Sequence, residues 1–240
     1  TLTTSALAVG THSITATYVG GVNFLPGTPA AISQVVNTAP TTTTVSSTPS
    51  PSVYGQSVTF TAVLNSAAGV GTATGSVKFM DGATSLGSSA VVVGGGYATL
   101  SVPNTTYPAA LMAGTHSITA VYTSGDVNFT GSTSPVYAQV VNKASVSTTL
   151  TSSLNPSLSG QSVTFTAQVS VLAPGSGTPS GTVSFMDGTT TISTGTLNSA
   201  GWTILTTSAL GTGTHSITAV YSGDANFAAN TSSALSQTVN

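Results

Sequence analysis

The only histidines of the chain, His12, His116 and His215, occupy one position of a repeated phrase. Each follows Gly-Thr and precedes Ser-Ile-Thr-Ala. A metal site needs several ligands around one ion, and no Cys, no Glu and no second His lies near any of the three in the sequence. We therefore expect a structural role, in which each imidazole bonds back to the backbone at the corner where a strand begins.

All four aspartates fall in two other repeated phrases. Asp81 and Asp187 follow Phe-Met, and Asp126 and Asp224 stand in the phrase SGDxNF. Calcium binds best where several carboxylates surround one ion, whereas each repeat offers only two, in different loops. A third copy of SGDxNF carries Gly21 at the Asp position. We expect these aspartates to form turns, with Asp126 and Asp224 as weak calcium candidates and no other metal ligand.

Catalysis requires titratable groups that converge on one point. Neither a Ser-His-Asp set nor a pair of carboxylates can be assembled from the few such residues without repeating it in every unit. The many serines are surface hydroxyls unless a base is positioned beside them. We expect no catalytic residue, no cofactor and no enzyme.

Three Asn-x-Ser/Thr sequons are candidate glycosylation sites. They begin at Asn104, Asn128 and Asn230. In a chain so rich in Ser, Thr and Asn such triplets arise by chance, and they matter only if the source organism glycosylates secreted proteins.

Charge and composition exclude other classes of protein. The 240 residues include two Lys, no Arg, four Asp and no Glu, for a net charge of -2. No basic surface can therefore neutralise phosphates, which argues against nucleic-acid binding. No apolar stretch approaches the roughly 18 to 20 residues that span a bilayer, so we expect no membrane insertion. Roughly a third of the residues are Ser or Thr, and with 26 Gly and 11 Pro this composition predicts an all-β protein.

Repeated phrases divide the chain into units of about 100 residues. The three histidines are 104 and 99 residues apart, and the phrases GQSVTFTA and FMDG each occur twice in the same order. The units close with VVN, VVN and TVN. The repeats predict the last three strands of a domain in residues 1–37 and complete domains in residues 38–142 and 143–240.

Within the last unit, apolar and polar residues alternate in seven short segments separated by Gly, Pro, Asn and Asp. Val163, Phe165, Ala167 and Val169 should face the core, with the intervening Thr and Gln in water. About 100 residues with seven strands describe a two-sheet Ig-like sandwich. The short junctions VVN-TAP-TTTTV and VVN-KAS-VSTTL predict tandem sandwiches joined by short linkers.

The phrases GQSVTFTA, GTVxFMDG and LxxGTHSITAxYSGDxNF together resemble the bacterial Ig-like domain of group 3. The resemblance covers both complete units and, through the last phrase, residues 1–37. It implies a tandem array in a large secreted or surface-attached bacterial protein, in which such domains act as stalks, spacers or adhesive segments.

Two functions follow from this organisation. The first is structural: an extracellular stalk, adhesin shaft or filament whose partners are flanking repeats or neighbouring copies of itself. The alternative is an adhesive module that binds carbohydrate or another surface through Thr-rich faces and exposed aromatic residues. Its aromatic candidates are Trp202, Tyr97 at the same repeat position, and Tyr107. Full burial of Trp202 would favour the stalk.

Overall fold

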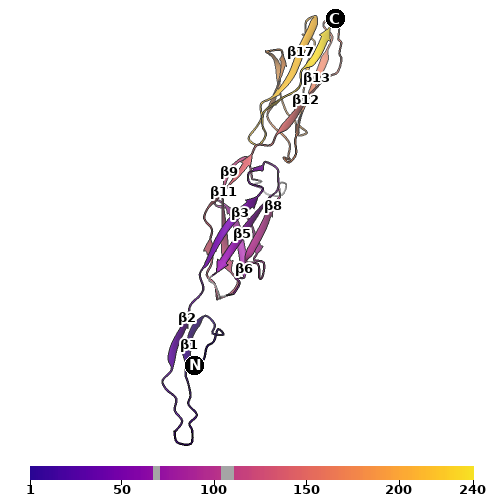
Figure 1. Cartoon of the computed structure of the whole chain (residues 1–240). Coiled ribbons are helices and arrows are strands. Elements are labelled where there is room, and N and C mark those ends of the chain that lie inside the picture. The colour runs from indigo at the N-terminus through magenta and orange to yellow at the C-terminus, as the bar shows by residue number, and fades with distance from the viewer. Residues whose placement is uncertain (67–70, 104–110) are drawn as a thin grey trace. The chain divides into compact units, whose positions relative to one another are not determined.

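The computed structural model describes residues 1–66, 71–103 and 111–240. Every element of regular secondary structure in these residues is a β-strand (Figure 1). The predicted all-β class is confirmed. The described residues contain no helix that is long and apolar enough to cross a membrane. In chain order the strands are β1 Gly10–Ile14, β2 Ile32–Val36, β3 Thr41–Thr48, β4 Ser52–Val53, β5 Val58–Ser66, β6 Gly75–Asp81, β7 Thr84–Ala90, β8 Tyr97–Val102, β9 Gly114–Ser124, β10 Ser132–Thr133, β11 Tyr137–Asn142, β12 Val146–Ser152, β13 Val163–Val171, β14 Thr182–Asp187, β15 Thr190–Thr196, β16 Trp202–Thr207, β17 Gly213–Tyr221, β18 Asn230–Thr231 and β19 Leu235–Val239.

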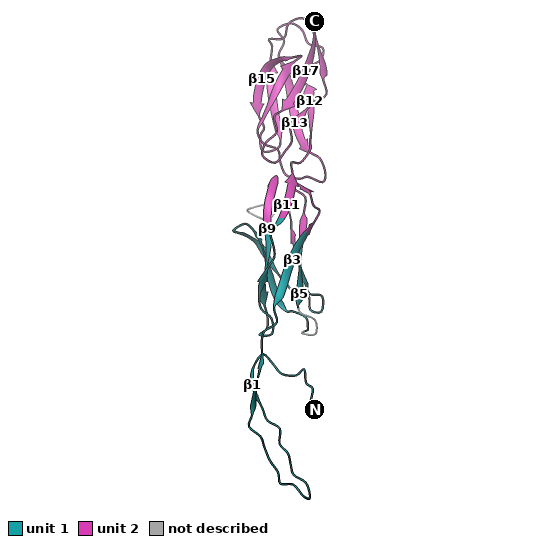
Figure 2. Ribbon diagram, turned by 60° about the vertical axis from the view of Figure 1, so that its left-hand side comes forward, with its two compact units in different colours: residues 1–46, 60–100, 118–137 teal, residues 47–59, 101–117, 138–240 magenta. Residues whose placement is uncertain are grey.

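The described chain divides into two compact units (Figure 2). Strands β12 to β19 lie wholly in the second unit, whereas β3, β5, β8, β9 and β11 contribute residues to both. The sequence predicts that complete repeats begin at residues 38 and 143. The first strands after these two residues are β3 and β12. The first unit comprises Thr1–Ser46, Phe60–Leu100 and Ile118–Tyr137, and the second comprises Ser47–Thr59, Ser101–Ser117 and Ala138–Asn240.

The C-terminal sandwich consists of two sheets. One has the order β12-β13-β16, and the other has the order β15-β14-β17-β18 with β19 also paired to β17. The seven predicted strands are present, and the two-residue β18 is an eighth. A hydrogen bond from Ala144 N to Asn226 O and a second from Ala228 N to Ala144 O attach the start of this repeat to its own loop.

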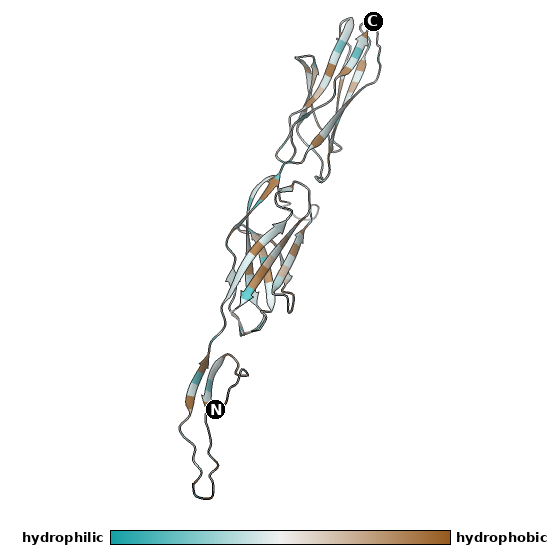
Figure 3. Ribbon diagram, in the orientation of Figure 1, coloured by the Kyte–Doolittle hydropathy of each residue, from teal (hydrophilic) through white to brown (hydrophobic). Residues whose placement is uncertain are grey.

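Its core follows from the alternation of side chains along each strand. On β13, Val163, Phe165, Ala167 and Val169 are buried, while Thr164, Thr166 and Gln168 face outward and are partly exposed. Phe185, Ile217 and Tyr221 from the opposite sheet complete the core. Figure 3 shows hydrophobic and polar bands alternating along the strands. Successive side chains of a strand point to opposite faces, so one apolar face per sheet is enough to build this core.

The middle sandwich, β3 to β11, repeats the arrangement. The sheets have the orders β3-β5-β8 and β4-β11-β9-β6-β7, with β10 paired to β9. Phe60 and Phe79 are fully buried, and their ring centroids lie 6.3 Å apart. β6 and β14 each pair with the next strand through a register shift beside Phe79 or Phe185.

Residues 1–37 carry two strands rather than the three expected. β1 and β2 pair antiparallel, with Gly10 opposite Val36 and Ile14 opposite Ile32. β17 and β19 pair in the same register in the C-terminal sandwich, where Gly213 lies opposite Val239. No residue of this segment is buried, and the counterpart of the β17–β18 pairing is a single antiparallel bridge in which Tyr18 N donates to Gly27 O at 2.8 Å and Gly27 N donates to Tyr18 O at 3.0 Å. A two-stranded ribbon has no second sheet to pack against and is marginally stable in water by itself, so its residues stay exposed or half-buried.

Candidate functional site

Each histidine bonds to the backbone of its own corner. The imidazole Nε2 lies 2.7 Å from Ala8 O in His12, 2.8 Å from Met112 O in His116 and 2.9 Å from Gly211 O in His215. A carbonyl oxygen only accepts, so Nε2 carries the proton in all three. The side chain therefore closes the turn four residues upstream of the histidine.

His215 has a second partner in the carboxylate that ends β14. Its Nδ1 lies 2.6 Å from Asp187 Oδ2. The hydrogen bond to Asp187, followed by that to Gly211 O, raises the pKa of His215 above 6.5, against a smaller opposing effect of burial. Both acceptors favour the imidazolium, which can donate from both nitrogens.

The same contacts argue against general-base catalysis by His215. With Asp187 at Nδ1, the nitrogen left to take a proton from a hydroxyl would be Nε2, and Gly211 O already binds it. Among the described residues no group of three or more His, Cys, Asp or Glu could hold a metal ion.

Asp224 closes the loop between β17 and β18. Its Oδ1 accepts hydrogen bonds from the backbone N–H groups of Asn226 and Phe227, each at 2.8 Å. Its Oδ2 accepts from the N–H of Ser180 at 3.0 Å and from the hydroxyl of Ser180 at 2.7 Å. Burial alone would raise the pKa of this carboxyl, but the four hydrogen bonds outweigh burial and lower it. The carboxylate is thus saturated with protein donors.

A tyrosine lies beside each of these loop carboxylates. The hydroxyl of Tyr221 donates to Ser180 O at 2.7 Å, and that of Tyr122 donates to Thr74 O at 2.6 Å. Burial, followed by the charge of Asp224, raises the pKa of Tyr221 to about 12. Asp126 accepts from the hydroxyl of Thr74 at 2.7 Å. Both proposed calcium ligands therefore stand in turn-closing clusters.

The sequons lie in different surroundings. Asn128 is exposed, whereas Asn230 is half-buried in β18 and its Oδ1 accepts a hydrogen bond from Thr148 N at 2.9 Å. Asn104 and Tyr107 lie outside the described residues. Of the two sequons that the structure describes, the one at Asn128 is the more exposed.

Sequence reasoning missed a buried glutamine in the last strand of each sandwich. The side chain of Gln237 is fully buried; its Oε1 accepts from the hydroxyl of Ser152 at 2.7 Å and its Nε2 donates to Leu154 O at 2.9 Å. Gln139 is equally buried, and its carboxamide bonds Ser47, Pro49 O and Ser52. The signal was a Gln at an inward position of each closing strand, as in AQVVN and SQTVN.

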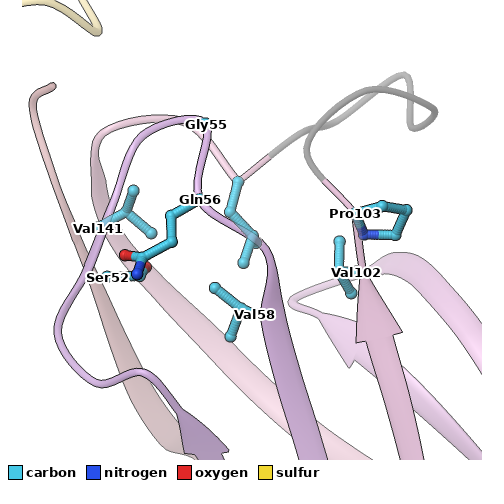
Figure 4. Close-up of a pocket in the computed structure, with 8 residues that line it drawn as sticks. Ser52, Gly55, Gln56, Val58, Val102, Pro103 and Val141 are labelled. Atoms are coloured by element: carbon cyan, nitrogen blue, oxygen red, sulfur yellow. The ribbon is translucent and has the colours of Figure 1, made fainter. Parts of the chain in front are cut away.

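An open groove of about 340 Å³ lies beside β12 and β19 of the C-terminal sandwich. At one end of the middle sandwich a cavity of about 10 Å³ has room for one water molecule (Figure 4). A groove of about 960 Å³ runs along β1 and β2 and is the apolar face that these two strands leave uncovered. The residues around the small cavity are Ser52, Gly55, Gln56, Val58, Val102, Pro103, Leu111 and Val141.

The two described aromatic candidates are on the surface. Trp202 is 44% exposed and Tyr97 is 40% exposed, each at the first position of its strand. The full burial of Trp202 that would favour a stalk is therefore not observed.

Comparisons with known proteins give one matching family and several similar structures. The family model of the bacterial Ig-like domain (group 3) matches residues 44–142 and 150–240. The chain is similar in structure to the Yersinia pseudotuberculosis adhesin InvE, with 16% identity and a TM-score of 0.39 over 82% of this chain and 58% of that one. It is also similar to the Escherichia coli adhesin FdeC, with 15% identity and a TM-score of 0.32 over 88% and 69% of the two chains.

The D0-D1 domain of intimin is a further similar structure. Its identity is 16% and its TM-score 0.29, over 82% of this chain and 97% of that one. No curated protein matches the chain. The two family matches cover most of the sequence, so the chain belongs to the bacterial Ig-like domain (group 3) family.

Proposed function

We propose that the chain is a shaft segment of an extracellular bacterial repeat protein: a stalk, adhesin shaft or filament whose sandwiches transmit tension along the polypeptide. Membership of a bacterial Ig-like family, tandem repeats and an almost uncharged surface support this role. Its partners are the repeats that flank it and neighbouring copies of the same chain.

The observation that carries the proposal is the parallel pairing of the first and last parts of each complete sandwich. In the middle sandwich, β4 pairs parallel with β11, with Ser52 opposite Val141. In the C-terminal sandwich, Ser157 and Val239 form a parallel bridge. Ser157 N donates to Thr238 O at 3.0 Å, Asn240 N to Ser157 O at 2.8 Å and Ser159 N to Asn240 O at 2.9 Å.

Parallel end segments resist a pull on the two termini. Tension drives them past each other along their length, so the bonds that join them must break together. If the end segments were antiparallel neighbours, the same pull would open one bond at a time. Resistance to force is governed by the unfolding rate, which this arrangement keeps low under load.

The test is single-molecule pulling of the whole chain through handles at its two ends. We expect two unfolding events, one for each complete sandwich. Each should release about 300 Å of chain, because roughly 100 residues become extended at about 3.3 to 3.6 Å per residue. In Ser159→Pro the hydrogen bond to Asn240 is lost because proline has no N–H. One of the two events should then move to lower force.

The design contains two controls. The middle sandwich is unchanged in Ser159→Pro, so its event must keep its force, and Ser159→Ala keeps the N–H and should leave both events unchanged. Equal forces in the proline variant and the unaltered chain would show that the parallel segments do not resist tension, and the shaft proposal would be lost.

A further inference from the structure

The outward face of the sheet β12-β13-β16 is polar and free of ionisable side chains. We define this outer face by three rows of residues that lie opposite one another on neighbouring strands. In the first row Gln168 stands between Thr149 and Trp202, and in the second Thr166 stands between Thr151 and Ile204. The third row is the pair Thr164 and Thr206, whose hydroxyl groups lie 2.9 Å apart.

Two large apolar side chains stand on this polar face. Trp202 is 44% exposed and Ile204 is 61% exposed. Thr203, which stands between them on β16, faces inward and is buried. Leaving so much apolar area in water forgoes roughly 25 cal/mol per Å² of potential stabilisation. A sheet that needed only to be soluble would carry threonine at these positions, as β12 and β13 do.

The backbone that carries Trp202 is fixed on both sides. Asn198 Oδ1 accepts hydrogen bonds from the N–H groups of Ala200 and Trp202, at 2.9 and 3.1 Å, and Asn198 N donates to Trp202 O at 2.8 Å. Gly201 has φ of +77°, a conformation that favours glycine, and its carbonyl accepts from Val169 N at 2.9 Å. The backbone from which the indole projects is therefore preorganised.

The middle sandwich repeats this construction with a different aromatic residue. Gly96 has φ of +63°, its carbonyl accepts from Leu64 N at 2.7 Å, and Tyr97 follows it with its carbonyl bonded to Val92 N at 2.8 Å. The hydroxyl pair recurs as Thr59 and Ser101, at 2.7 Å. A glycine in the left-handed region followed by an exposed aromatic residue is thus a feature of both complete repeats.

We propose that the outer face with Trp202 binds a neutral polysaccharide. The flat C–H face of a pyranose ring stacks on an indole, and its hydroxyls pair with Thr and Gln side chains, which both donate and accept. The lack of charge on the face fits an uncharged polymer, whereas nucleic acids and acidic polysaccharides need cationic groups. The platform at Tyr97 provides a second site of the same kind on the chain.

Trp202 supplies its own reporter, because it is the single tryptophan of the chain. The intact chain is titrated with dextran, mannan and laminarin as neutral probes and with alginate as an acidic one. We expect at least one neutral polymer to shift the Trp202 emission and to protect it from acrylamide quenching at least twofold, with no response to alginate. No response to any neutral probe, or an equal response to alginate, would overturn the proposal.

Variants separate the platform from general stickiness. By affinity electrophoresis, Trp202→Ala should weaken binding of the responding polymer at least tenfold, and Trp202→Ala with Tyr97→Ala should abolish it. Leu158→Ala removes another exposed apolar side chain of the same unit, away from the outer face, and should bind like the unaltered chain. Circular dichroism and melting show that each variant is folded, and unimpaired binding by folded Trp202→Ala would refute the site.

Discussion

At the scale of single residues, the side chains that could do chemistry are used to close turns. Sequence reasoning placed the three histidines at a corner and the aspartates in turns. In the structure His215 bonds to Gly211 O four residues upstream, and Asp224 accepts from the N–H of Asn226 in its own loop. The partner of His215 could not be read from the sequence, because Asp187 lies on another strand and only the register of β14 with β17 brings it near. Gln237 was missed because the alternation was used to place apolar residues only, although it also puts this Gln at an inward position of its strand.

These contacts predict opposite responses to acid and to base. Because the pKa of His215 is raised in the folded chain, its contribution is full below pH 6.5 and is lost as pH rises through the raised value. The pKa of Asp224 is lowered from 3.8, so its contribution is present above that value and is lost as pH falls through the lowered one. The free energy of unfolding of the C-terminal sandwich should therefore be highest between about pH 4 and 6.5. The solvent-accessible pair of His215 and Asp187 should contribute at most about 1 kcal/mol to it.

Proton NMR titration of the imidazole signals together with urea denaturation at about pH 5.5 and 8.5 checks this expectation. Asp187→Asn should return the pKa of His215 toward 6.5 and reduce the difference in stability between the two pH values, while the hydrogen bond to Gly211 O remains. If the stability of the sandwich is higher at the alkaline pH, the linkage has the wrong sign.

At the scale of elements, alternation predicted nearly everything in the C-terminal sandwich. Val163 to Val169 lie as expected, and strand ends differ by only a few residues, since Gly, Pro and Asn mark the turns. Two features escaped. β18 spans only two residues and has no period to detect, and the left-handed glycine before Trp202 depends on a carbonyl contact to another strand.

Replacing that glycine should disrupt the turn. A Cβ at Gly201 would lie 2.7 Å from Val169 O, and its φ of +77° is strained for any other residue. Both effects act on backbone that cannot move without breaking the β13–β16 pairing, so Gly201→Ala should destabilise the C-terminal sandwich by about 2 kcal/mol or more. Thermal denaturation followed by circular dichroism measures the loss.

Gly211→Ala is the matched control. No atom lies within 4 Å of a Cβ built there, and its φ is not positive. Its stability should stay within about 0.5 kcal/mol of that of the unaltered chain. Equal losses in the two alanine variants would show that the left-handed turn is not what the glycine provides.

At the scale of the whole molecule, copies of the same repeated sequence differ in side-chain burial, depending on which other strands of the repeat are present. The segments GTHSI of β1 and β17 have the same register with their partner strands. Phe227 is 3% exposed, while its counterpart Phe24 is 72% exposed. Local sequence therefore specifies the hairpin, and burial depends on the other strands of the repeat.

The last prediction follows from that difference. A copy of residues 143–203 placed ahead of Thr1 supplies the strands equivalent to β12 through β15 and the start of β16, which are the ones that cover Ile217, Tyr221 and Phe227. Amide hydrogen exchange of β1 and β2 should then slow by at least about 100-fold, toward the rates of β17 and β19 in the same chain, because exchange would require opening of a complete core. As a control, the added copy carries Ser in place of the phenylalanines equivalent to Phe165 and Phe185; it cannot build the core and should leave the exchange fast. Fast exchange of β1 and β2 behind the intact copy would mean that residues 1–37 do not encode the closing strands of a repeat.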